Sequence, residues 1–169
     1  NPTLRLLFAY ETTRLARLVL NRNPQQFKRY SAVLHKARFY MEQTDGEFPN
    51  LPEVHYLLGE TAALTNQIDK ATEEYTTALK LDPSYVDAYN ALGQLYQQTD
   101  RPQLALQTYI KAAKYAPTNG EIWQKLGLQF EKEGNLFEAS SALQNAIKFQ
   151  PNDIPSYIGL GRVFLNLRN

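Results

Sequence analysis

The side chains that could support catalysis or bind a metal are few in this sequence. The chain has two histidines, His35 and His55, and no cysteine. Two histidines without convergent carboxylates do not make a zinc or general-base site. The adjacent carboxylates Glu73 and Glu74 would point about 100° apart on a helix, so we expect both to be solvated. We therefore predict no catalytic residue, no metal site and no cofactor.

Composition narrows the remaining function classes. The 169 residues carry 18 basic and 17 acidic side chains, a net charge of +1 that does not favour nucleic-acid binding. The sequence lacks both a phosphate-binding glycine loop and a nucleophile elbow. It also lacks an apolar run long enough to span a bilayer, so we expect a soluble chain that is cytoplasmic by default, with membrane association as the alternative. Because the first residue is Asn1, we interpret the sequence as part of a longer or processed chain.

Glycine and proline each recur at a step of 34 residues, and this period indicates how the chain is divided into helices. Each proline lies between two stretches with helical apolar spacing, which predicts a series of two-helix units. A glycine inside a helix costs ~1 kcal/mol relative to alanine, so its repetition indicates a close helix contact. We expect Asn66, Asp100 and Gly134 to mark the turns within each unit. The glycines are Gly59, Gly93, Gly127 and Gly161, and the prolines are Pro49, Pro83, Pro117 and Pro151.

The unit of residues 120–153 carries the clearest signature. It reads Trp123, Leu126, Gly127 and Phe130, then Ala139, Leu143, Ala146 and Pro151. This pattern resembles the tetratricopeptide repeat (TPR). The resemblance implies an all-α fold, a right-handed α-solenoid of helix-turn-helix TPR repeats preceded by an atypical helical pair. We predict the pair at residues 1–49, repeats at 52–85, 86–119 and 120–153, and at 154–169 the first helix of a fourth repeat or a capping helix.

The segment before the repeats is strongly basic. We expect helices near residues 3–20 and 25–43, and up to residue 41 eight basic side chains stand against one acidic side chain, a net charge of +7. One interpretation is a degenerate repeat or cap, whose apolar stripe of Leu4, Leu7, Phe8, Leu15, Leu18 and Val19 covers the first repeat. The alternative is docking on an anionic membrane surface or an acidic protein. The contacts would then be Arg14, Arg17, Arg22, Lys28 and Arg29.

The resemblance also implies where a partner would bind. In TPR proteins one stripe of each first helix lines a concave groove, and here this stripe is acidic and rich in amides. We therefore expect a protein or peptide partner of basic or polar character. TPR domains that bind acidic chaperone tails use a lysine and asparagine clamp, which is incomplete here, so a chaperone's acidic C-terminal tail is disfavoured. The predicted groove residues are Glu53, Tyr56, Glu60, Asp87, Asn90, Gln94, Gln97, Gln98, Glu121, Gln124, Leu128 and Glu131.

Three functions remain open after these observations. The favoured function is a non-catalytic scaffold, adaptor or assembly factor. The second is the recognition arm of a larger enzyme, such as a glycosyltransferase or peptidase, with its catalytic domain outside these residues. The third is membrane-surface docking through the basic N-terminal helices. The helix expected at residues 154–167 is apolar on nearly every side, so we predict that further chain or a partner covers it.

Overall fold

The computed structural model describes residues 2–47 and 50–168, and the described chain is entirely helical apart from short turns. Pro49, one of the periodic prolines, lies outside the described residues. The predicted all-α class of paired helices is confirmed, with no strand in the described ranges. The elements are α1 (Pro2–Arg22), the 3-10 turn η1 (Pro24–Gln26), α2 (Phe27–Glu47), α3 (Pro52–Leu64), α4 (Ile68–Leu81), α5 (Val86–Gln98), α6 (Pro102–Tyr115), α7 (Gly120–Lys132), α8 (Leu136–Phe149) and α9 (Ile154–Leu167).

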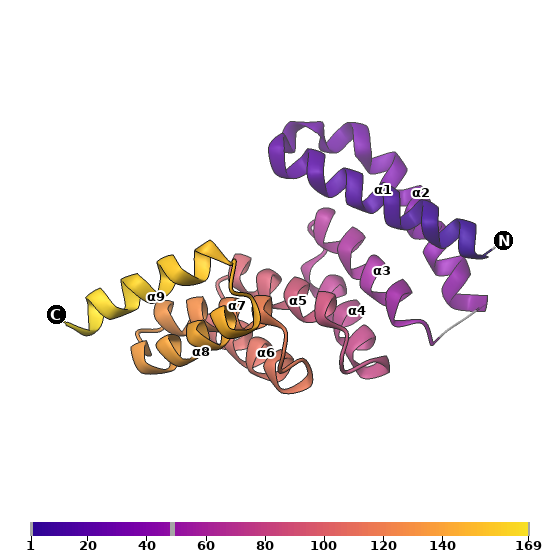
Figure 1. The fold of residues 1–169 in the computed structure, drawn as a ribbon. Coiled ribbons are helices and arrows are strands. Elements are labelled where there is room, and N and C mark those ends of the chain that lie inside the picture. The colour runs from indigo at the N-terminus through magenta and orange to yellow at the C-terminus, as the bar shows by residue number, and fades with distance from the viewer. Residues whose placement is uncertain (1, 48–49, 169) are drawn as a thin grey trace. The chain divides into compact units, whose positions relative to one another are not determined.

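The chain divides into two compact units, and each is described by itself. Unit 1 covers Asn1–Ala91 and unit 2 covers Leu92–Asn169, so the division falls inside α5. In unit 1, α1 pairs with α2 and α3 pairs with α4, and both α1 and α2 also pack against α3 (Figure 1). In unit 2, α7 pairs with α8, α6 packs against α7, and α9 packs against α8 and α7.

Three of the periodic glycines lie where two paired helices approach most closely. A Cβ atom on Gly59 would lie 2.6 Å from the Tyr75 ring, and one on Gly93 would lie 2.5 Å from the Tyr109 ring. The same atom on Gly127 would lie 2.6 Å from the Leu143 side chain. Such distances are far below van der Waals contact, so only glycine fits between the paired helices. Gly161 differs, because nothing lies within 4 Å of its Cβ position.

The turns of the α3–α4, α5–α6 and α7–α8 pairs share one geometry. Asn66 and Asp100 adopt positive φ angles of 58° and 54°, and Gly134 follows with 78°. In the first turn the Gln67 amide donates to the Ala62 carbonyl at 2.8 Å, the long bond of a left-handed helix cap. The predicted turn residues are thereby confirmed. The equivalent bonds run from Arg101 to Tyr96 at 2.8 Å and from Asn135 to Phe130 at 2.9 Å.

The N-terminal helix packs mainly through small residues, together with Leu20 and, in part, Leu6. Ala9, Thr13 and Ala16 are almost fully buried, because small side chains let α1 approach its neighbours. The predicted apolar stripe is largely wrong, since Leu4, Leu7, Phe8, Leu15 and Leu18 are 40–64% exposed, whereas Val19 is half-buried. In unit 1, Ala9 belongs to a core with Ala37, Met41, Val54, Leu57 and Leu58. In unit 2, Ala139, Leu143 and Val163 form a core that positions α7, α8 and α9.

Candidate functional site

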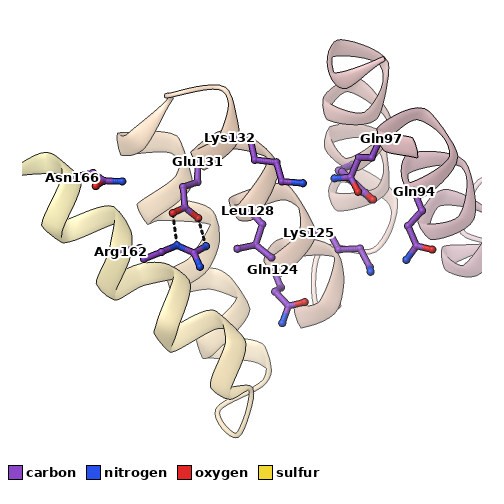
Figure 2. A pocket seen from close by; sticks show the side chains of 10 residues that line it. Gln94, Gln97, Gln124, Lys125, Leu128, Glu131, Lys132, Arg162 and Asn166 are labelled. Atoms are coloured by element: carbon purple, nitrogen blue, oxygen red, sulfur yellow. Dashed lines mark hydrogen bonds and ion pairs between the residues drawn. The ribbon is translucent and has the colours of Figure 1, made fainter. Parts of the chain in front are cut away.

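A polar pocket in unit 2 is lined mainly by first helices of the repeats. Its volume is about 510 Å³, and its lining comes from α5, α7 and α9 with one tyrosine from α6. Figure 2 shows the α7 and α9 side chains on one side and the two glutamines of α5 on the other. We call it the polar pocket. Its residues are Gln94, Gln97, Tyr109, Gln124, Lys125, Leu128, Glu131, Lys132, Arg162 and Asn166.

Hydrogen bonds inside unit 2 orient two amide side chains of the polar pocket, those of Gln97 and Gln124. Gln97 donates through Nε2 to the Oε1 atom of Gln129 at 2.7 Å. Gln129 is buried and donates in turn to Glu133 at 2.9 Å. Gln124 donates to the Asp153 carboxylate at 2.5 Å. Because each of these amides uses a donor within the unit, the pocket presents side chains in fixed orientations.

The charge of the polar pocket differs from the acidic character expected for the groove. Arg162 donates two hydrogen bonds to the Glu131 carboxylate, at 2.7 and 2.6 Å, and this contact raises the pKa of Arg162 (Figure 2). Lys125 lies 3.5 Å from Glu121, its partner one turn earlier on α7. Among the described residues that line the pocket, Lys125, Lys132 and Arg162 are cationic and Glu131 is anionic. Its net charge is therefore positive.

In unit 1 the predicted groove residue Glu60 is not at the surface. It is 3% exposed, forms an ion pair with Arg17 from α1, and accepts a hydrogen bond from the Tyr75 hydroxyl at 2.7 Å. Burial raises the pKa of the Glu60 carboxyl, and the Arg17 charge offsets part of this effect. Glu60 therefore serves the packing of α1 on α3. Arg17, one of the basic residues considered for an anionic surface, is already occupied by that contact.

A second pocket in unit 1 is apolar and aromatic. Its volume is about 300 Å³, and three tyrosines contribute to its wall. The rings of Tyr56 and Tyr85 meet edge to face with centroids 5.4 Å apart. Burial raises the pKa of Tyr56 to about 12, so its phenol is neutral at physiological pH. We call this the tyrosine pocket, and its residues are Thr3, Leu6, Leu7, Tyr10, Glu53, Tyr56, Leu57 and Tyr85.

The remaining candidate residues are the other predicted groove residues and the basic residues of the N-terminal helices. Glu53 and Asp87 are exposed in the first turns of α3 and α5. Gln98 and Glu121 are also exposed, and Asn90 is half-buried. The basic side chains considered for an anionic surface, other than Arg17, are exposed: Arg14, which contacts Glu11 at 3.3 Å, and Arg22, Lys28 and Arg29.

His55 has a structural contact across the α3–α4 pair. Its Nδ1 atom lies 2.9 Å from the Glu74 carboxylate. In the ranges that the structure covers, no three acidic, histidine or cysteine side chains gather as metal ligands would. Within those same ranges, each helix is too short or too polar to cross a bilayer.

Several pocket residues were not among the sequence-based candidates. Tyr10, Leu6 and Leu7 come from α1, which carries no repeat signature and therefore has no register from which to place them. Lys125 lies outside the positions that the repeat assigns to the groove, whereas Arg162 is at a groove position of the last helix, from which no candidate was taken. The 34-residue period gives a weak signal for Arg162, since it places this residue one period after Leu128, which was a candidate.

Comparison with known proteins identifies one repeat family. A family model described as "TPR repeat" matches residues 63–100, and a second, "Tetratricopeptide repeat", matches residues 86–119. The tetratricopeptide repeat domain-containing protein PYG7, chloroplastic, of Arabidopsis thaliana is 29% identical over 98 residues, which are 52% of this chain and 33% of the relative. The chain thus spans about a third of that relative's length.

Solved structures share the fold at lower identity. The structure "MamA 41-end from Desulfovibrio magneticus RS-1" superposes with a TM-score of 0.66 at 21% identity, covering 95% of this chain and 86% of the other. YrrB, described as "a TPR protein with an unusual peptide-binding site", gives a TM-score of 0.65 at 18% identity, covering 94% of this chain and 77% of the other. At these identities the likeness concerns the fold alone.

Proposed function

We propose, because this chain belongs to the tetratricopeptide-repeat family, that it is a protein–protein interaction module. It acts as a scaffold, adaptor or assembly factor and binds a segment of a partner protein. The observation that carries this proposal is the polar pocket, whose side chains come mainly from α5, α7 and α9 and are oriented by bonds within unit 2. A pocket of about 510 Å³ suits part of an extended segment. The peptide-binding site for which the YrrB structure is described is consistent with this use of the fold.

The chemistry of the polar pocket favours a polar segment. Glutamine and asparagine side chains can donate and accept, so Gln94, Gln124 and Asn166 suit the amide groups of an extended backbone. The excess of cations favours carbonyl or carboxylate acceptors at this point of the segment. The basic partner character expected from the sequence therefore applies to unit 1 alone, where Glu53 and Asp87 are exposed.

The other two functions have weaker support. For membrane-surface docking, Arg17 is paired with Glu60 and Arg14 with Glu11, which reduces the charge available to anionic lipid. For the recognition arm of an enzyme, no particular contact of the described residues distinguishes it from a scaffold. The apolar side chains of α9 fit either function, and we propose that further chain or a partner packs against them. Ile154, Ile158 and Leu165 are 58–68% exposed.

Site-specific photocrosslinking tests the proposed function. A photoreactive amino acid is placed at Gln94 in the polar pocket of the full-length protein, and in a matched variant at Lys111, exposed on α6. We expect one partner to be crosslinked from position 94 and not from position 111. Equal crosslinking from both positions, or none from position 94, would count against binding in the polar pocket.

A further inference from the structure

The tyrosine pocket is lined mainly by aromatic and aliphatic side chains, whereas the polar pocket is lined mainly by amides and charged groups. Three aromatic rings, from Tyr10 on α1, Tyr56 on α3 and Tyr85 before α5, meet the aliphatic side chains of Leu6 and Leu7. Tyr10 is 47% exposed and Leu7 is 55% exposed. The wall is thus open to a ligand while it remains largely apolar.

The charges around the tyrosine pocket are acidic. Among the described residues that line it, Glu53 is the only charged one. Asp87 lies close enough to act electrostatically on both Tyr56 and Tyr85. The Arg17 guanidinium, which acts on Tyr56 through a side-chain hydrogen bond, is ion-paired with the buried Glu60, so its charge is compensated within unit 1. A cation entering the pocket would therefore meet the exposed carboxylate of Glu53, with that of Asp87 nearby, and aromatic rings that can attract it.

We propose that the tyrosine pocket binds the side chain of a lysine or arginine in the partner segment. This inference rests on the proposed function and names the chemistry that unit 1 selects. The methylene groups of the cationic side chain pack on Leu6, Leu7 and the tyrosine rings, as long cationic side chains do on apolar surfaces. Its charged end lies at Glu53, with Asp87 nearby. A volume of about 300 Å³ suits one large side chain rather than a length of backbone.

An uncharged apolar side chain is the competing occupant. It would gain the same burial against the leucines and tyrosines, but it would gain nothing from Glu53 and would take solvent from that carboxylate. Charge complementarity therefore favours the cation. The two occupants can be distinguished with norleucine, which has nearly the stem of lysine without the ammonium group.

The test is a titration of the full-length protein with blocked hexapeptides, followed by NMR of ¹³C-labelled tyrosine rings. The peptides share a glycine–serine background and differ at one central residue, which is lysine, arginine, norleucine or glutamate. We expect lysine and arginine to shift the rings of Tyr10, Tyr56 and Tyr85. Norleucine should bind about threefold more weakly or worse, as the loss of a cation–π contact implies.

Variants locate the binding in the pocket. Glu53→Gln should weaken the lysine peptide by about threefold, and Tyr85→Leu should weaken it by at least as much. Tyr85→Phe keeps the ring and should bind like the wild type. The matched control is Glu138→Gln, at an exposed carboxylate of α8 in unit 2, which should change nothing. Circular dichroism of every variant checks that the helices are intact.

Two results would overturn the inference. Norleucine binding as tightly as lysine would make the pocket an apolar subsite, and an absence of ring shifts with every peptide would exclude the pocket as a site. Neither result touches the proposed function if position 94 still crosslinks the partner. Failure of that crosslinking, with the ring shifts retained, would instead remove the polar pocket and leave the tyrosine pocket as the binding site.

Discussion

At the scale of single residues, the periodic glycines are not equivalent. Gly127 faces Leu143 at a distance that leaves no room for a methyl group, whereas Gly161 faces open space. We predict that Gly127→Ala lowers the free energy of unfolding by about 1–3 kcal/mol, because α7 and α8 must move apart. Gly161→Ala should raise it by up to about 1 kcal/mol, since alanine is the better helix former. Denaturant unfolding of both variants measures the difference.

The pair Gly127 and Gly161 serves as its own control. Both lie in first helices one repeat apart, so helix propensity changes equally in the two variants. A loss of stability at Gly161 similar to that at Gly127 would show that the repeated glycine is not explained by helix contact.

The buried Glu60 gives a pH dependence of unusual sign. Burial raises the pKa of its carboxyl above the ordinary 4.5, so the folded chain retains a proton that the unfolded chain has released. Between 4.5 and the higher folded pKa, its contribution to the free energy of unfolding therefore falls as pH rises. We predict that the stability difference between the wild type and Glu60→Gln shrinks as pH rises above the ordinary carboxyl value of 4.5. Urea unfolding at several pH values measures this difference.

The opposite trend would identify the ion pair as the stronger influence. If the Arg17 charge outweighed burial, the folded pKa of Glu60 would lie below its ordinary value. The same difference in stability would then grow with pH. The pairing of Glu60 could not be predicted from the sequence, because it depends on how α1 packs against α3, and α1 carries no repeat signature.

At the scale of the elements, the turns between paired repeat helices each need one residue with a left-handed backbone conformation. Gly134 has a φ of 78°, which other residues adopt at a cost, and Asp100 adopts a similar angle of 54°. We predict that Gly134→Ala lowers the free energy of unfolding by about 1–2 kcal/mol. Asp100→Gly should be neutral or raise it by about 0.5 kcal/mol, because relief of the strained angle outweighs the added freedom of the unfolded chain. Thermal and urea unfolding test both, and destabilisation by Asp100→Gly would contradict the argument.

The apolar side chains of α9 permit a second prediction at this scale. Ile158 and Leu165 are 58% and 65% exposed, whereas Val163 on the same helix is fully buried. The double variant Ile158→Lys/Leu165→Lys should change the free energy of unfolding of the 169-residue chain by less than about 1 kcal/mol and should reduce its self-association. Val163→Lys should unfold α9. Sedimentation together with circular dichroism separates these effects, and unchanged self-association would show that this face makes no contact between copies.

The repeat helices were predictable in a way that the N-terminal pair was not. Within the repeats, glycine, alanine and proline at fixed positions define both the helix ends and the contacts, as Gly59 and Tyr75 show. In α1 the buried face is made mainly of small residues such as Ala9 and Ala16, with Leu20 beside them. A hydrophobic pattern alone assigned that face to the leucines. The error has a physical cause, since close helix packing selects for small volume and a pattern of large apolar residues cannot report it.

At the scale of the whole molecule, a net charge of +1 conceals two pockets of opposite character. The tyrosine pocket is lined by one carboxylate and has Asp87 nearby, whereas the polar pocket carries three cations and one carboxylate. The acidic residues of the predicted groove could be identified from the repeat register. Their contribution to the charge of the groove could not be predicted, because Glu60 forms an ion pair with Arg17 and Glu131 forms one with Arg162.

If a partner uses both pockets, its affinity should depend on the positions of the charged side chains rather than on the net charge of the protein. We compare three doubly neutralised forms of the full-length protein, each changed by two charges. They are Glu53→Gln/Asp87→Asn in unit 1, Lys125→Gln/Lys132→Gln in unit 2, and Lys111→Gln/Lys114→Gln on the exposed side of α6. The last two variants have the same net charge, so any difference between them comes from the position of the lysines.

We predict that the first two variants bind the crosslinked partner at least about threefold more weakly than the wild type, mainly because association is slower. The affinity of the α6 variant should stay within about twofold of the wild type. Surface plasmon resonance at low and physiological salt measures the rates, and the losses should shrink as salt screens the charges. Equal weakening in the two lysine variants would mean that the partner senses the overall field of the protein. The two pockets would then not be separate determinants of binding, because the partner would be held by net charge rather than by the side chains that these helices bring together.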